Sequence, residues 1–393
     1  MSGAVGDDLG LDKDPQELID PHDVMEDQDQ KSVLIIYTGG TMGMKPDEQG
    51  SLAPVPGYLV QVLKEMPEMH QPEMPKYDIV EYEPLIDSSS MGPKDWTKIA
   101  TDISDNYLKY DGFVVCMGTD TMAYAASALS FMLENLGKPV IFTGSLIPQF
   151  EVYSDARRNL LVSIIYAMSC DIPEVCVCFN DQLLRGNRTK KVNSVGMAAF
   201  ESPNYPQLAV LGTVIRYRHH LALKPPKFHL KVHKRLSGDA IVIKLVPGFN
   251  DAVLMTLAQH TDRKTLKAIV LELYGTGNGP SDKQGLLDAI STAQSRGILI
   301  VGLSQCIKGT VALDSYALGR EFMRRGVIPC EDMTTEACVT KLAYLLGRGN
   351  GDVAYVRKFL SIDLRGELTP RGKAGIKFFT NSQKGEALGR SKL

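Results

Sequence analysis

The sequence predicts a two-domain α/β protein: a larger N-terminal domain with a mainly parallel sheet flanked by helices, and a smaller C-terminal α/β domain. Short β-branched runs end in small, Gly-rich turns and alternate with helical stretches, which is typical of a parallel sheet covered by helices. The chain has 393 residues, enough for two or three domains. A basic, Pro-broken stretch near residues 216–240 interrupts the alternation, which then resumes.

Four strand–turn units predict the N-terminal domain, residues 31–220. They are strand 32–37 with turn 38–43, strand 112–117 with turn 118–121, strand 139–142 with turn 143–145, and strand 175–179 with a polar turn from 180 to 191. Residues 121–136 and 154–168 predict helices; the first ends at a Gly-Lys-Pro stop signal and the second begins at a Ser-Asp cap. Ligands bind beyond the carboxyl ends of such strands, where these turns fall.

The basic stretch predicts a linker, residues 221–240, that crosses between the domains. A solvated basic face explains its composition better than a polyanion-binding patch. In the C-terminal domain, residues 241–374, strands are expected at 241–246, 268–273 and 297–301. The motif Asp332-Met-Thr-Thr-Glu336 predicts the start of a helix that continues to residue 346.

Both ends of the chain differ from the rest. Residues 1–30 carry ten acidic side chains against one Lys, which predicts a disordered acidic arm and fits neither a signal peptide nor a mitochondrial transit peptide. The tail, residues 375–393, ends in Ser391, Lys392 and Leu393, the tripeptide that a peroxisomal import receptor reads at a free C-terminus. This predicts a peroxisomal or related organelle matrix if the source is eukaryotic; the alternative is a cytosolic protein with a polar tail.

Composition and spacing argue against several classes of function. A net charge of −3 does not suit a protein whose main task is to bind nucleic acid. The longest apolar runs are too short to span a bilayer. Cys176 and Cys178 alternate within an apolar strand, which indicates reduced core cysteines, and the seven His have no metal-binding spacing. Neither GxGxxG nor GxxxxGK[ST] occurs, so no metal or nucleotide cofactor is expected.

The polar turns contain the groups that acyl transfer needs. Thr38-Gly-Gly-Thr41 puts hydroxyls on a backbone free to bend around a substrate, Gly118-Thr-Asp-Thr121 adds a carboxylate, and Lys190-Lys191 adds amines. A Lys amine can remove the proton of a Thr hydroxyl, and glycine N–H groups can hold the developing oxyanion. For each turn alone, ordinary turn chemistry or helix capping by Asp120 is a sufficient explanation.

Taken together, these motifs resemble those of the bacterial-type L-asparaginases, specifically the cytoplasmic type I branch. The resemblance covers about residues 31–370. It is carried by Tyr37-Thr-Gly-Gly-Thr-Met-Gly43, Asp87-Ser-Ser-Ser-Met91, Gly118-Thr-Asp-Thr-Met-Ala123, Arg185-Gly-Asn-Arg-Thr189 with Lys191, and Asp363-Leu-Arg-Gly-Glu-Leu-Thr-Pro370. Several separated motifs in the expected order are far more specific than any one alone.

The resemblance implies hydrolysis of L-asparagine to L-aspartate and ammonia by an asparaginase-like architecture. It implies Thr41 as the nucleophile that forms an acyl-enzyme, and a homodimer or homotetramer. A second catalytic set and the substrate contacts also follow from the resemblance. The set is Thr119, Asp120 and Lys191, and the substrate contacts are Asp87, Ser88, Ser89, Thr119 and Asp120.

Three positions depart from the family pattern. Many relatives carry a Tyr on the loop after the first motif, whereas Gln49-Gly-Ser-Leu-Ala53 has none and Tyr58 lies further on. Ser90 replaces a frequent Asp. Glu272 stands where some type I enzymes use an Arg to bind regulatory asparagine near a motif like Ser304-Gln-Cys306, and its charge would repel that effector's carboxylate.

Two other kinds of function remain open from the sequence. The first is another amidase or esterase use of the same site, on glutamine, a peptide β-amide or a lysophospholipid. The second is a non-catalytic amino-acid sensor, which would bind asparagine without releasing ammonia.

Overall fold

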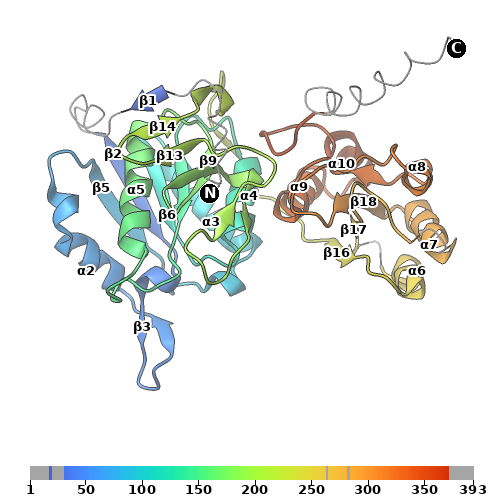
Figure 1. Cartoon of the computed structure of the whole chain (residues 1–393), viewed down its shortest axis with the longest axis horizontal. Coiled ribbons are helices and arrows are strands. Elements are labelled where there is room, and N and C mark those ends of the chain that lie inside the picture. Colours follow the sequence, from blue (N-terminus) through green and yellow to red (C-terminus); the bar gives the residue numbers. More distant parts are fainter. Residues whose placement is uncertain (1–16, 20–30, 263, 281–283, 371–393) are drawn as a thin grey trace, which may run out of the picture.

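The computed structural model describes residues 17–19, 31–262, 264–280 and 284–370, and it contains the two predicted α/β domains (Figure 1). The N-terminal domain, blue to green, holds a nine-stranded sheet, and the C-terminal domain, yellow to red, holds a four-stranded one. Among the described residues, three two-stranded sheets, β3–β4, β11–β12 and β7–β15, belong to the N-terminal domain and the linker.

The large sheet has the order β1-β14-β13-β10-β9-β8-β6-β2-β5, and its five strands from β9 to β5 run parallel. Four of these strands, β9, β8, β6 and β2, are apolar and almost wholly buried because helices cover both of their faces, whereas the edge strand β5 alternates exposed and half-buried residues. The strands of this domain are β1 (Glu17–Ile19), β2 (Ser32–Tyr37), β3 (Met44–Pro46), β4 (Leu52–Pro54), β5 (Lys76–Glu81), β6 (Gly112–Cys116), β7 (Leu133–Glu134), β8 (Val140–Thr143), β9 (Val175–Phe179), β10 (Gln182–Arg185), β11 (Lys190–Lys191), β12 (Phe200–Glu201), β13 (Ala209–Leu211) and β14 (Ile215–Tyr217).

Two helices cover each face of this sheet. Helices α3 (Pro93–Asn106) and α4 (Met122–Met132) pack on one face, and α2 (Tyr58–Glu65) and α5 (Ala156–Ser169) on the other. Short 3₁₀ helices lie at the turns: η1 (Thr41–Gly43), η2 (Pro67–His70), η3 (Ser88–Ser90), η4 (Gly186–Arg188) and η5 (His219–Leu221).

The C-terminal sheet is parallel throughout, in the order β16-β17-β18-β19. Its strands are β16 (Ala240–Lys244), β17 (Ala268–Leu273), β18 (Leu299–Ser304) and β19 (Ile328–Pro329). Helices α6 (Asp251–His260), α7 (Gln284–Ser295) and α8 (Ala317–Arg324) pack on one face, and α9 (Thr335–Arg348) and α10 (Val353–Phe359) on the other. Helix α9 begins where the sequence predicts a start, since the Thr334 hydroxyl accepts a hydrogen bond from the Ala337 N–H.

The two domains meet where α4 packs against α9 (Figure 1). The rings of Phe131 and Tyr344 stack 5.9 Å apart, and the buried hydroxyls of Ser127 and Thr340 lie 2.8 Å apart. The linker contributes β15 (Lys231–Val232), which pairs antiparallel with β7. The linker is therefore bound to the N-terminal domain rather than crossing freely.

Three expectations differ from the structure. The segment 180–191, expected to be a polar turn, contains β10, η4 and β11. The helix expected at 121–136 ends at Met132, because the next two residues leave it to pair with β15. Within the arm expected to be disordered, Glu17–Ile19 form β1 at the sheet edge, paired with β14. The rest of that arm, residue 263, residues 281–283 and the tail from residue 371, with Ser391, Lys392 and Leu393, lie outside the described residues.

The seven cysteines are free thiols, and Cys176 and Cys178 lie buried on β9, as their alternation predicts. Within the described ranges, no helix has both the length and the apolar character needed to cross a membrane.

Candidate active site

Three turns at the carboxyl ends of neighbouring strands pack backbone against backbone. Strand β2 leads into Gly39 and Gly40, whose φ angles are +132° and +94°. A Cβ on Gly40 would lie 2.3 Å from the backbone nitrogen of Gly118, the residue that begins the turn beyond β6. Only glycine allows this approach, which brings the start of η1 at Thr41 beside the turn that carries Thr119. Thr41 itself is half-buried.

The third turn, residues 86–89, follows β5 and closes on the other two. The Ile86 N–H donates to the carbonyl of Thr38 at 2.7 Å. The Thr121 hydroxyl donates to the carbonyl of Ser88 at 2.7 Å, and Ser88 is buried against Gly118. The exposed carboxylate of Asp87 accepts hydrogen bonds from the Ser89 N–H and hydroxyl, which orders the turn as η3.

Lys191 connects the second turn to β11. Its ammonium donates to the Thr119 hydroxyl at 2.8 Å and to the Asp120 carboxylate at 2.6 Å. The Lys191 side chain is 18% exposed and that of Asp120 is 68% exposed, so the pair lies at the surface with Asp120 open to solvent. Lys190, its neighbour, points to a different partner, the Glu336 carboxylate, at 3.0 Å.

Tyr124 lies close enough to two carboxylates of the C-terminal domain for their charges to affect its phenol. Tyr124 is on α4, shortly after Asp120, and burial together with the carboxylates of Glu336 and Glu272 raises its pKa to about 12. Glu272 accepts a hydrogen bond from the Thr335 hydroxyl at 2.9 Å. The Tyr124 phenol is therefore neutral at physiological pH, and Glu272 contacts the start of α9.

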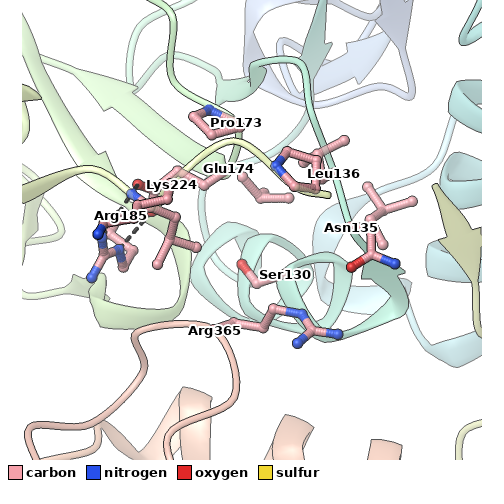
Figure 2. Close-up of a pocket in the computed structure, with 12 residues that line it drawn as sticks. Ser130, Asn135, Leu136, Pro173, Glu174, Arg185, Lys224 and Arg365 are labelled. Atoms are coloured by element: carbon pink, nitrogen blue, oxygen red, sulfur yellow. Dashed lines mark hydrogen bonds and ion pairs between the residues drawn. The ribbon is translucent and has the colours of Figure 1, made fainter. Parts of the chain in front are cut away.

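A cavity of about 210 Å³ lies at the domain junction (Figure 2). Figure 2 shows Arg185 joined to Glu174 on one side, with Ser130, Asn135 and Arg365 facing the cavity from below. None of the predicted catalytic residues lines it. The predicted catalytic residues lie instead on the turns described above. Among the described residues, no three His, Cys, Asp or Glu side chains converge as a metal site requires.

Comparison with known proteins places this arrangement in a family. The family model described as asparaginase, N-terminal, matches residues 32–223, and the one described as glutaminase/asparaginase C-terminal domain matches residues 240–360. The chain belongs to the asparaginase family. L-asparaginase 1 of Escherichia coli (strain K12) is 48% identical over 345 residues, which cover 87% of this chain and 99% of that protein.

Other relatives of this asparaginase-family chain include a solved structure and an enzyme of a different name. The crystal structure of L-asparaginase I from Vibrio cholerae superposes with a TM-score of 0.79 at 42% identity, covering 86% of this chain and 99% of that one. The 60 kDa lysophospholipase of Mus musculus is 41% identical over 86% of this chain and 63% of its own length.

The structure brings together most residues that the motifs single out. Thr119, Asp120 and Lys191 are in direct contact, and the turns that carry Thr41 and Ser88 both pack on Gly118. Their roles in catalysis remain predictions. Sequence reasoning missed Glu336 as a neighbour of this site: its motif predicted only a helix start, and nothing in the spacing of residues 190 and 336 indicates contact.

The loop after Thr41 forms the hairpin β3–β4, which projects from the domain (Figure 1). The Lys45 ammonium of this hairpin lies 3.8 Å from the ring centroid of Tyr58, at the start of α2. This cation–π contact occupies the Tyr58 ring at the base of the hairpin.

Proposed function

We propose that the protein hydrolyses the side-chain amide of L-asparagine to L-aspartate and ammonia through a threonine acyl-enzyme. The observation that carries the proposal is the hydrogen-bonded set of Lys191, Thr119 and Asp120. The turn that carries Thr41 packs directly on the turn of this set, because Gly40 contacts Gly118. Membership of the asparaginase family supports the same reaction.

In the proposed reaction, the Thr41 oxygen attacks the amide carbon while its proton passes to the neutral Lys191 amine, and the backbone N–H groups of the glycine turns hold the oxyanion. The resulting ammonium supplies the proton that the leaving nitrogen takes up. The C–N bond breaks as the nitrogen gains a proton, so ammonia leaves and an ester on Thr41 remains. Water then attacks the ester, releasing L-aspartate and restoring the Thr41 hydroxyl. Thr119 with Lys191 and Asp120 activates the attacking hydroxyl or water.

The charged ends of the substrate have candidate partners around this set. The ammonium of asparagine needs an anion, which the exposed carboxylates of Asp87 and Asp120 supply. Its carboxylate needs donors, which Ser88, Ser89 and the Thr119 hydroxyl supply. This division of roles favours an α-amino acid amide over an uncharged amide.

Ammonia release from purified protein tests the proposal, with L-asparagine and L-glutamine compared at equal concentration. We expect release from asparagine and its loss in Thr41→Ala. Wild-type protein that binds asparagine without releasing ammonia would instead be the amino-acid sensor. Near-normal release by Thr41→Ala would reject the nucleophile assignment.

A lysophospholipase is the second candidate, because the mouse relative of that name is 41% identical over most of this chain. Fatty-acid release from lysophosphatidylcholine, measured on the same preparations, separates the two. The asparaginase proposal expects ammonia release and no fatty-acid release.

We further propose that the protein forms a homodimer or homotetramer, which light scattering of the purified chain tests.

We also propose that Ser391, Lys392 and Leu393 direct the protein to peroxisomes where Leu393 is the natural end of a eukaryotic chain. A fluorescent protein joined ahead of Met1 should enter peroxisomes and become cytosolic only when Leu393 is deleted. A cytosolic signal from the intact tail would reject import.

A further inference from the structure

The segment Arg185–Lys191 reaches the catalytic set only after passing along the C-terminal domain. It comprises the end of β10, η4, Thr189 and β11. Within it, Lys191 contacts Thr119 and Asp120 of the N-terminal domain. The side chains of Arg188 and Lys190, which precede it, contact residues about 140–180 positions away in the chain. The position of the Lys191 ammonium therefore depends on how the C-terminal domain holds this segment.

Arg188 is the first anchor of the segment. Its guanidinium, 2% exposed, donates to the Asp332 carboxylate at 2.9 Å and to the Gly366 carbonyl at 2.6 Å. Asp332 in turn accepts hydrogen bonds from the Thr369 N–H and hydroxyl. A buried guanidinium with this many partners fixes η4 against the C-terminal domain.

Lys190 is the second anchor and lies directly beside the catalytic Lys. Its ammonium, 31% exposed, donates to both oxygens of Glu336, at 3.0 and 3.3 Å, and the Glu336 side chain is 7% exposed. Glu336 lies in the first turn of α9, where the helix dipole also favours a negative charge. The ion pair therefore joins β11 to a rigid element of the other domain.

Strand geometry links this ion pair to the orientation of Lys191. Lys190 and Lys191 form β11, paired antiparallel with Glu201 and Phe200 of β12. Successive side chains of a strand point to opposite faces, so holding Lys190 toward α9 turns Lys191 toward Thr119 and Asp120. A rotation or slip of this two-residue strand would move both ammonium groups together.

We propose that Glu336 is a positioning residue for catalysis: by holding Lys190, it orients Lys191 toward Thr119 and Asp120. The role rests on the proposed asparaginase function, because orientation of Lys191 matters only if Lys191 acts in turnover. Glu336 does not touch the reacting groups in this arrangement. It acts through the backbone of β11.

Glu336→Gln, Lys190→Met and the double variant test this role by steady-state ammonia release. Misplacing a catalytic group by about 1 Å can cost about 10²-fold, so we expect each single variant to lose about 10- to 100-fold in kcat with KM changed less than about threefold. Because both residues act through one contact, the double variant should lose no more than the worse single variant. If Glu336→Gln does not fold, Lys190→Met still tests the role, because it removes the same ion pair at its more exposed partner.

Glu321→Gln is the matched control, since it removes a carboxylate that pairs with Arg324 and Arg325 on α8, away from the segment. It should leave kcat unchanged. A kcat within about twofold of wild type in folded Glu336→Gln or Lys190→Met overturns the proposal, as do losses that multiply in the double variant. A lowered melting temperature with unchanged kcat would mean a structural role alone and also overturns it.

Backbone hydrogen exchange tests the positioning role of Glu336 without relying on ammonia release, so it can be judged apart from the proposed function. Backbone amides of residues 186–193 should exchange faster in Glu336→Gln than in wild type, with no such change in Glu321→Gln. If wild-type protein releases no ammonia, the asparaginase proposal fails, and exchange still decides whether Glu336 holds β11. Unchanged protection in Glu336→Gln overturns the positioning role whatever the activity.

Discussion

Lys191→Met separates a catalytic loss from a structural one. Methionine has nearly the length of lysine and keeps the partly buried stem packed, but it cannot donate to Thr119 or Asp120. The change therefore removes one hydrogen bond to a hydroxyl and one ion pair, and nothing else in contact with the site.

The structure limits how much this change can cost in stability. Asp120 is 68% exposed, so solvent screening reduces its ion pair to at most about 1 kcal/mol. The hydrogen bond to Thr119 adds about 1 kcal/mol. For a chain of 393 residues, the unfolding entropy is about 0.8 kcal/mol/K, so the melting temperature should fall by about 2–3 °C. Loss of an acid–base group should lower kcat by about 10²–10⁴-fold, or about 3–5 kcal/mol in the barrier.

The assay is steady-state ammonia release from L-asparagine, with the melting temperature of each preparation measured by calorimetry. Lys98→Met is the control: it breaks an exposed ion pair with Asp102 on α3, and its kcat should match wild type. A folded Lys191→Met protein that keeps more than about a tenth of wild-type kcat would refute the role of Lys191 as an activating group.

Three further changes are informative. Thr41→Ala should lower kcat by about 10⁴-fold or more with an unchanged circular-dichroism spectrum, because no nucleophile remains. Gly40→Ala puts a Cβ at φ +94° against Gly118, so calorimetry should show about 1–3 kcal/mol lost in unfolding free energy and the ammonia assay a kcat at least about tenfold lower. Glu367→Gln leaves the Lys341 ammonium buried without its counter-charge. This change should lower the free energy of unfolding by about 3–5 kcal/mol at pH 7. Burial favours a higher pKa for Glu367, but Lys341 outweighs it and lowers that pKa below the ordinary 4.5. The stabilisation is therefore complete above pH 4.5 and is lost as the pH falls through the folded-state pKa, so the melting-temperature difference from wild type should narrow in acid. Unchanged stability in Gly40→Ala, or a pH-independent difference in Glu367→Gln, would contradict the reasoning.

Much of the fold followed from local patterns. The apolar run that became β2 and the alternation of Cys176 and Cys178 on β9 reflect the two-residue period of strands, which a sequence displays directly. The end of α4 was missed because it depends on pairing with β15, about a hundred residues further along the chain. The strand in the acidic arm was missed for the same reason, since Glu17–Ile19 is ordered by the edge of β14.

The candidate site, like the fold, has features that the sequence shows directly and features that depend on contacts between distant residues. The sequence alone determined the residue types and their place in turns after strands, and the resemblance to the family singled out Lys191. Only the tertiary structure decided that Gly40 touches Gly118 and that Glu336 holds Lys190. Periodicity and turn chemistry are properties of a few consecutive residues. These contacts instead join segments far apart in the chain, within one domain for Gly40 and between the two domains for Glu336, and no local pattern records which distant residues become neighbours.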